Sequence, residues 1–124
     1  MSNATSYPTV TPYLIVPDAD AILRFVTRAF GATEQMVQRN ADGSVAHAEM
    51  KIGDSLIMVG QAGGPWKPKP AALYLWIGDV DAAYRRALEA GATSETPPED
   101  KPYGQRMAGV DVGGVTWWLA APLK

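Results

Sequence analysis

The sequence predicts an α+β fold built from two βαβββ units. The main evidence is a set of short motifs in the first half of the chain that recur in the second half. Asp18-Ala-Asp20 recurs as Asp79-Val-Asp81, Gly31-Ala-Thr33 as Gly91-Ala-Thr93, and Ile52-Gly53 as Val112-Gly113. Each offset is about 60 residues, half of the chain, so each half is expected to build the same small unit.

The first unit starts with a β-branched and aromatic segment at residues 9–16, which is typical of a strand and is closed by Pro17. Asp18 is a good N-cap because its carboxylate can accept free amide hydrogens of a first helical turn. Apolar residues at helical spacing then predict a helix over Ala19–Phe30, which Gly31 ends. Three short strands complete the unit: 33–39, 45–52 and 55–59.

The second unit repeats this design after a connector. The connector, Gln61–Pro70, is rich in proline and glycine and is expected to be extended and stiff. Asp79 caps a helix that is predicted over Val80–Ala90, and Gly91 ends it. The strands of this unit are expected at 72–77 before the helix, and at 93–96, 105–110 and 115–120 after it.

These elements predict a single domain over residues 9–124, preceded by a disordered leader at residues 1–8. The first unit covers about residues 9–60, the connector residues 61–70, and the second unit about residues 71–121. A chain of 124 residues is long enough to bury a substantial core.

The composition of the chain excludes several classes of partner and of metal site. The formal net charge is −2 and no basic cluster occurs, which argues against nucleic acid and membrane surfaces as partners. The chain has no cysteine and a single histidine, His47, which excludes zinc–cysteine sites and sites with several histidines from one chain. The N-terminus lacks a signal-peptide pattern and no apolar run could span a bilayer, so a cytoplasmic protein is expected.

Strand alternation assigns side chains to two faces. The face that packs against the helices is expected to hold apolar residues, in the first unit Leu14, Val16, Ala46, Ala48, Met50, Ile57 and Val59. The opposite face carries Tyr13, His47, Glu49, Met58, Tyr74, Trp76 and Trp118. This second face is rich in aromatic and thioether groups, has one imidazole and one carboxylate, and is expected to be concave.

An ordered series of motifs resembles the vicinal oxygen chelate superfamily, in particular its glyoxalase/bleomycin-resistance branch and the PhnB-like group. The motifs include Pro12-Tyr13-Leu14-x-Val16, His47-Ala48-Glu49-Met50, Asp79-Val80-Asp81, Tyr103-Gly104-x-Arg106, and Asp111-x-x-Gly114 ahead of Trp117. The resemblance implies two curled mixed sheets around a cleft, usually in a homodimer.

The resemblance also implies where a metal would bind. Metal-using members place one ligand on the first strand and one on the last strand of each unit, which corresponds to positions near Thr11, Met58, Ala72 and Trp118. Divalent metals in this setting favour imidazole nitrogen or carboxylate oxygen, which none of these side chains provides. We therefore expect no metal and no other cofactor.

The second face provides the candidate ligand contacts. His47 and Glu49 lie two residues apart on one strand, where they could contact a ligand or shuttle a proton, or hold strands or a dimer interface together. Tyr13, Tyr74, Trp76 and Trp118 could be plain core, or together form a pocket that stacks against flat rings.

Two further residues have two interpretations each. Trp66, in the connector, could be a lid or rim of the cleft or a clip onto the sheet. Arg106 could bring a guanidinium to an anionic ligand group, or could be a structural arginine in a turn. The Asp79-x-Asp81 motif is better explained by helix capping than by metal binding.

The predicted function is a metal-free protein that sequesters a planar aromatic small molecule such as an antibiotic, in the manner of drug-resistance proteins. The predicted ligand-binding residues are Tyr13, His47, Glu49, Met58, Trp66, Tyr74, Trp76, Arg106 and Trp118, and no catalytic residue is assigned. One alternative is a lyase-, isomerase- or dioxygenase-like enzyme of the same superfamily that uses His47 and Glu49 as acid–base or metal-binding groups. Another is an interaction domain whose aromatic residues form a dimer interface.

Overall fold

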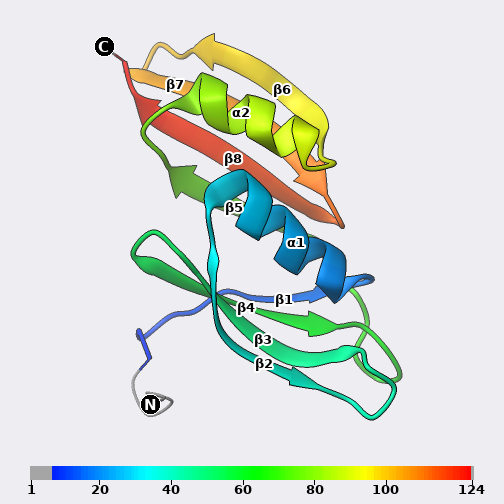
Figure 1. Cartoon of the computed structure of the whole chain (residues 1–124). Helices are drawn as coiled ribbons and strands as arrows, with labels where there is room; N and C mark the ends of the chain where they lie inside the picture. The colour runs from blue at the N-terminus through cyan, green and yellow to red at the C-terminus, as the bar shows by residue number, and fades with distance from the viewer. Residues whose placement is uncertain (1–6, 124) are drawn as a thin grey trace.

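Two four-stranded mixed sheets, each with one helix packed against it, make up the structure, a computed structural model that describes residues 7–123 (Figure 1). The elements of the first unit are β1 (Tyr13–Val16), α1 (Ala19–Phe30), β2 (Thr33–Arg39), β3 (Val45–Ile52) and β4 (Ser55–Gln61). Those of the second are β5 (Ala71–Trp76), α2 (Val80–Glu89), β6 (Thr93–Asp100), β7 (Gln105–Val112) and β8 (Val115–Pro122).

The two sheets have the same topology. Their strand orders are β1-β4-β3-β2 and β5-β8-β7-β6. In each sheet the first strand of the unit runs parallel to the last, and the remaining pairs are antiparallel. The duplicated motifs of the sequence thus correspond to a duplicated βαβββ unit, and the predicted fold class is confirmed.

Local signals in the sequence explain both helices. Asp18 Oδ1 accepts a hydrogen bond from the amide of Ala21, and Asp79 Oδ1 accepts one from the amide of Ala82, both at 3.1 Å. Gly31 ends α1 with a φ of 69°, a left-handed conformation that glycine adopts without a Cβ clash. The predicted bounds of α1 are confirmed, and α2 ends one residue before the predicted limit.

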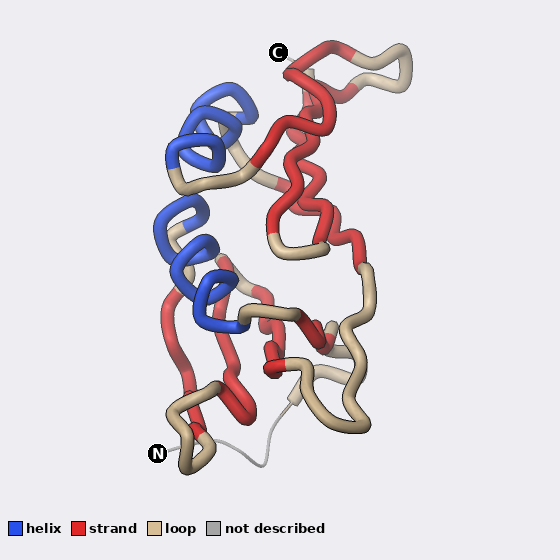
Figure 2. The backbone as a smooth tube through the Cα atoms, turned by 90° about the vertical axis from the view of Figure 1, so that its right-hand side faces the viewer, coloured by secondary structure: helices blue, strands red, loops and turns tan. Residues whose placement is uncertain are grey.

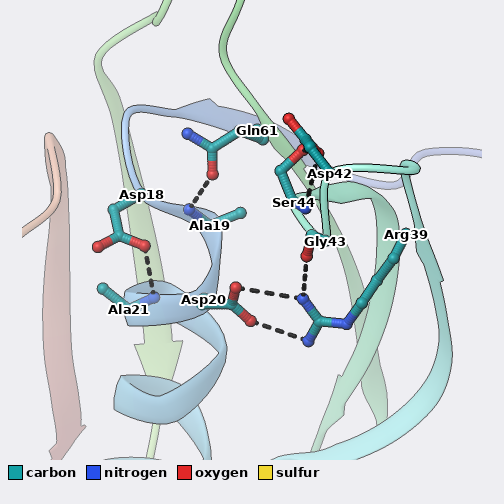
Figure 3. Close-up of polar contacts among 9 residues, drawn as sticks. All are labelled: Asp18, Ala19, Asp20, Ala21, Arg39, Asp42, Gly43, Ser44 and Gln61. Atoms are coloured by element: carbon teal, nitrogen blue, oxygen red, sulfur yellow. Dashed lines mark hydrogen bonds and ion pairs between the residues drawn. The ribbon is translucent and has the colours of Figure 1, made fainter.

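Further polar contacts fix the start of α1 on its sheet (Figure 3). Gln61 Oε1, at the end of β4, accepts a hydrogen bond from the amide of Ala19 at 3.0 Å. Arg39 binds both carboxylate oxygens of Asp20, at 3.0 and 3.2 Å, and also donates to the carbonyl of Gly43. The first turn of the helix is therefore tied both to the inner strand β4 and to the edge strand β2 of the first sheet.

Most predicted strand bounds lie within two residues of the observed ones, and the two larger differences, in β1 and β6, both involve proline. β1 begins at Tyr13 instead of residue 9, and the preceding Pro12 contributes only its carbonyl, which accepts from the amide of Met58. β6 extends to Asp100 instead of ending at Thr96. It is an edge strand with shifts in register, a setting that tolerates the prolines at 97 and 98.

Helix α1 joins the two units. Phe25 and Phe30 on α1 pack against the fully buried Trp117 of β8, with ring centroids 5.6 and 5.7 Å apart. The two helices lie next to each other (Figures 1 and 2), and Arg86 Nε on α2 donates to the carbonyl of Ala29 on α1 at 3.1 Å. One core cluster therefore draws on residues of both units.

The alternation of the strands is largely as predicted. Leu14, Val16, Ala48, Met50, Ile57 and Val59 are buried on the helix side of the first sheet. Ala46 is the exception, because a shift in register between Gln38 and Arg39 brings Val45 into the core in its place. Neither helix of the described residues is long and apolar enough to cross a membrane.

Candidate functional site

The sheet faces that point away from the helices hold most of the predicted site residues. On the first sheet this face, called the first open face, carries Tyr13, His47, Glu49 and Met58. On the second sheet the corresponding second open face carries Tyr74, Trp76 and Trp118. The two sets lie on different sheets, and the two hollows that Tyr74 lines, of about 360 and 600 Å³, contain no member of the first set.

The strand register explains which residues meet on the first open face. Tyr13 of β1 lies opposite Met58 of β4, Met58 lies opposite Glu49 of β3, and Glu49 lies opposite Met36 of β2. These side chains form one row across the sheet. His47 lies two residues from Glu49 on the same face, as the alternation predicts.

A polar cluster centres on Glu49. Although it is on an open face, Glu49 is only 6% exposed. Its Oε2 accepts a hydrogen bond from Tyr7 Oη at 2.8 Å and lies 3.0 Å from His47 Nε2. The ring of Tyr13 stands edge-on to the imidazole of His47, with centroids 5.5 Å apart. The predicted pairing of His47 and Glu49 on one face is therefore present in the structure.

Tyr7 is a member of this cluster that the sequence did not indicate. It falls in the predicted leader, of which residues 1–6 lie outside the described part, whereas Tyr7 and Pro8 are described. The hydrogen bond to Glu49 raises the pKa of the Tyr7 phenol above its ordinary value of 10.0. The sequence offered one sign of this role: Tyr7 is an aromatic residue in a segment of mostly small or polar side chains.

The second open face has an equivalent row with different chemistry. Tyr74 of β5 lies opposite Trp118 of β8, Trp118 opposite Gly109 of β7, and Gly109 opposite Thr96 of β6. The six-membered ring of Trp118 lies against Gly109, where a Cβ would be 2.5 Å from Cζ3. The indole can occupy this place only because residue 109 has no side chain.

A hollow of about 360 Å³ lies above this row. Its lining consists of Tyr74, Thr96, Lys101, Tyr103, Met107, Ala108 and Trp118. Tyr103 Oη donates to Met107 Sδ at 3.0 Å, and Tyr74 Oη donates to Gln105 Oε1. The hollow thus combines the predicted Tyr74 and Trp118 with Tyr103 and Met107, which the sequence did not indicate as ligand contacts.

Carboxyl groups lie next to the aromatic row. Asp111 is opposite Thr116, whose hydroxyl donates to Asp111 Oδ1 at 2.5 Å. A hydrogen bond with Asp111 raises the pKa of the Glu95 carboxyl. The second open face therefore has polar acceptors two residues along the strands from Gly109 and Trp118.

Trp76 lies at the border of a second, more apolar hollow. This hollow has a volume of about 600 Å³ and runs between β5 and the turn that joins β3 to β4. Trp76 and Tyr74 contribute to its wall together with Leu73, Leu75 and Ile77. Trp76 is 62% exposed, so its indole is available to a ligand or to another protein surface.

Trp66 and Arg106 do not join either aromatic row. Trp66 is 67% exposed and lies in a tight turn, where its amide and carbonyl both bond to Gly63. Arg106 pairs with Asp81 at 3.0 Å and with Asp100 at 2.9 Å. These bonds raise the pKa of the guanidinium and lower the pKa of Asp81. Arg106 lines a hollow at the start of α2. Its two ion pairs there favour the interpretation of Arg106 as a structural arginine.

The residues at the expected metal positions do not fit a metal. Met58 offers a thioether beside the phenol of Tyr13, and Trp118 offers an indole beside the phenol of Tyr74. Thr11 and Ala72 add no imidazole or carboxylate, the donors that hard divalent ions require. Over residues 7–123, no three histidine, aspartate or glutamate side chains are grouped so that they could hold an ion.

Comparison with known proteins gives a consistent result. The model of the Glyoxalase/Bleomycin resistance protein/Dioxygenase superfamily matches residues 7–119. The Mycobacterium bovis protein Mb0911c is 33% identical over 129 residues, which cover 94% of this chain and 85% of that protein. The Mycobacterium tuberculosis protein Rv0887c is also 33% identical, over 94% of this chain and 76% of its own length.

Solved structures show the same architecture. TioX from Micromonospora sp. ML1 is 28% identical, with a TM-score of 0.78 over 94% of this chain and 100% of TioX. The fosfomycin resistance protein FosX from Mesorhizobium loti has a TM-score of 0.68 over 95% of this chain and 94% of FosX. At 18% identity, FosX shows a shared fold alone.

Proposed function

Because the chain belongs to the Glyoxalase/Bleomycin resistance protein/Dioxygenase superfamily, we propose that it sequesters a planar aromatic small molecule in the cytoplasm without a metal. The observation that carries the proposal is the place of the Trp118 ring against Gly109, beside Tyr74, in a hollow of about 360 Å³. The superfamily description includes bleomycin resistance, and FosX is named as a fosfomycin resistance protein. A role in antibiotic resistance is part of the proposal.

The residues at the expected metal-ligand positions favour stacking over metal binding. Where metal-using relatives are expected to place a donor on the last strand of each unit, this chain has Met58 and Trp118. Aromatic rings bind flat rings by offset stacking and lose little conformational entropy in doing so. Met107 adds a polarisable thioether to the same hollow. These substitutions remove a metal site and supply a stacking surface.

We further propose that the protein acts as a homodimer. Within one chain the His47–Glu49 pair and the Trp118 row lie on separate open faces. Tyr13, Tyr74 and Trp76 are 52%, 51% and 62% exposed, which is a large aromatic surface for a single chain. A second copy that covers these faces would bring the polar group of one chain next to the aromatic row of the other.

A second candidate function is an enzyme that uses the Glu49 cluster. A carboxylate that is 6% exposed, 3.0 Å from an imidazole and 2.8 Å from a phenol has the composition of an acid–base relay. This candidate requires turnover of the ligand. It is distinguished from sequestration by recovering the ligand unchanged after long incubation with the protein.

Calorimetric titration with flat probes such as acridine and quinoline tests the proposed function. Trp118→Ala is expected to weaken binding by about ten- to a hundredfold, because a stacking contact of this kind contributes about 1–3 kcal/mol. Leu88→Ala, on the exposed side of α2, is the matched control and is expected to bind as the wild type does. Equal affinity of the wild type and Trp118→Ala, or no binding of any flat probe, would contradict the proposal.

A further inference from the structure

We infer that Glu49 and His47 form a subsite for a hydroxyaryl group, and that Tyr7 of the same chain fills this subsite in the absence of ligand. The inference rests on the proposed function and its homodimer, since a second copy would bring this polar group to the planar ligand that stacks on the aromatic row. It adds a second chemical requirement, a ring-bound hydroxyl that donates to Glu49 Oε2. It also adds a new element, a displaceable tyrosine from the segment before β1.

Burial of the Glu49 carboxylate must be compensated by hydrogen bonds. A carboxylate that is 6% exposed needs hydrogen-bond donors, because burial of an unpartnered charge is strongly unfavourable. Its neighbours across the strands are the thioethers of Met36 and Met58, which cannot donate. The repeat offset of about 60 residues places Gly109 at the same position in the second unit. The fold therefore does not itself require a carboxylate here, which points to a role in binding.

Two side chains can donate hydrogen bonds to the Glu49 carboxylate. Tyr7 Oη lies 2.8 Å from Glu49 Oε2, and His47 Nε2 lies 3.0 Å from the same oxygen. When its proton is on Nε2, His47 donates a hydrogen bond to one lone pair of this oxygen. A phenol can donate to the other lone pair. The exposed ring of Tyr13, edge-on to His47 at 5.5 Å, provides an aromatic wall beside the acceptor. The chain thus already displays a phenol bound to this site.

The phenol of Tyr7 lies where a ligand can displace it. Tyr7 lies outside both sheets and is 42% exposed, so its phenol can leave Glu49 without breaking a strand pair. An incoming hydroxyaryl group replaces one O–H···O bond by another and adds the area of its own ring system. A methyl ether of the same ring system leaves the buried carboxylate without its second donor. Sites that hydrogen-bond a hydroxyl discriminate strongly against analogues that lack it.

The experiment compares 2-naphthol with 2-methoxynaphthalene, which differ only in the hydroxyl proton and a methyl group. Their affinities are measured by calorimetry for the full-length wild type, Tyr7→Ala and Glu49→Gln. Tyr7→Ala is expected to bind 2-naphthol roughly tenfold more tightly than the wild type, because the internal competitor is removed. Its affinity for 2-methoxynaphthalene is expected to rise by a similar factor, because this ligand also displaces Tyr7, so the preference for 2-naphthol is retained in Tyr7→Ala. Glu49→Gln is expected to lose most of the preference for 2-naphthol.

Two results would overturn the inference. One is that Tyr7→Ala binds 2-naphthol no better than the wild type, which removes the role of Tyr7 and is independent of whether Glu49→Gln folds. The other is that folded Glu49→Gln keeps the wild-type preference for 2-naphthol. The proposed function fails separately, when Trp118→Ala leaves the affinity for acridine and quinoline unchanged. The two failures therefore appear in different variants and with different probes.

Discussion

The benzene ring of Trp118 occupies the space in which a side chain at residue 109 would lie. A Cβ on Gly109 would come within 2.5 Å of Trp118 Cζ3 and 2.7 Å of Cε3. Real Cβ atoms do not approach other heavy atoms this closely. The rigid indole of Trp118, whose strand pairs with β5 at Tyr74, cannot yield as the end of a flexible side chain does. The position of the indole on the second open face is therefore linked to the glycine beneath it.

The first prediction tests this link. Gly109→Ala is expected to displace the Trp118 ring and to weaken binding of flat probes by about tenfold or more, close to the effect of Trp118→Ala. Gly78→Ala is the matched control, since it has no atom within 4 Å of the added Cβ and no positive φ. Calorimetry measures the affinities. If Gly109→Ala binds like Gly78→Ala, the ring does not depend on the glycine.

The second prediction concerns Arg106. Arg106→Ala is expected to lower the melting temperature at neutral pH while leaving the affinity for uncharged flat probes unchanged. The bonds to Arg106 lower the pKa of Asp81 below its ordinary value of 3.8, so their stabilising effect is present above that value and is lost as the pH falls through the lowered pKa. The difference in melting temperature between wild type and variant should therefore shrink on acidification below about pH 4.

A pH series of thermal melts measures this difference, and Arg24→Ala serves as a control because Arg24 is exposed on α1 and forms no ion pair with Asp81 among the described residues. A melting difference that persists unchanged at low pH would contradict the role given to the Arg106–Asp81 pair. A marked loss of affinity for an anionic flat probe in Arg106→Ala would instead support the sequence-based hypothesis that Arg106 contacts ligand.

The third prediction concerns the start of α2. Asp79→Ala is expected to lower the free energy of unfolding by about 1 kcal/mol, because the amide of Ala82 loses its acceptor. Asp79→Asn and Asp79→Ser, which keep a capping oxygen, should retain most of the stability. Urea denaturation provides the free energies. An equal loss in all three variants would show that the carboxylate charge, and not the cap, is responsible.

The fourth prediction concerns Trp66. If the connector closes over bound ligand, Trp66→Phe is expected to remove part of the ligand-induced fluorescence quenching and to weaken binding. The indole is now 67% exposed on a turn held by two bonds to Gly63, so it has room to move as one piece with that turn. Unchanged quenching and affinity in Trp66→Phe would eliminate the lid.

The fifth prediction is the assembly. Light scattering at micromolar concentration is expected to give twice the chain mass of 13.3 kDa. Trp76→Glu, which introduces a charge on the exposed aromatic surface, is expected to shift the mass toward that of one chain. A wild-type protein that is monomeric at this concentration would contradict the proposed homodimer.

Features that depend on local signals could be predicted from the sequence. The bounds of α1 follow from Asp18 and Gly31, and the βαβββ succession of elements in each unit follows from the repeated motifs. Alternation along their strands places Tyr74 and Trp118 on one face, and the parallel pairing of β5 with β8 makes them neighbours there. These features depend on residues near each other in the chain or on a rule with period two.

The features that were missed depend on contacts between different elements, which the residues of one element do not reveal. Val45 replaces Ala46 in the core because β2 and β3 shift register, which no pattern within β3 reveals. Tyr7 reaches Glu49 across 42 positions of the chain. The side chain of Arg106 is committed to two carboxylates from α2 and β6, and a turn motif alone does not indicate this.

The central claim, that a planar ligand stacks on Trp118 without a metal, is tested most directly by the indole N–H signals in a nitrogen-15 NMR spectrum of EDTA-treated protein. The indole signal of Trp117, which is fully buried and adjacent to Trp118 in the sequence, provides an internal reference. If acridine stacks on Trp118, its addition is expected to cause a ring-current shift of the Trp118 signal and to leave the Trp117 signal unchanged. A Trp118 signal that stays in place at saturating acridine, or a shift that appears only after a divalent metal is added back, would contradict it.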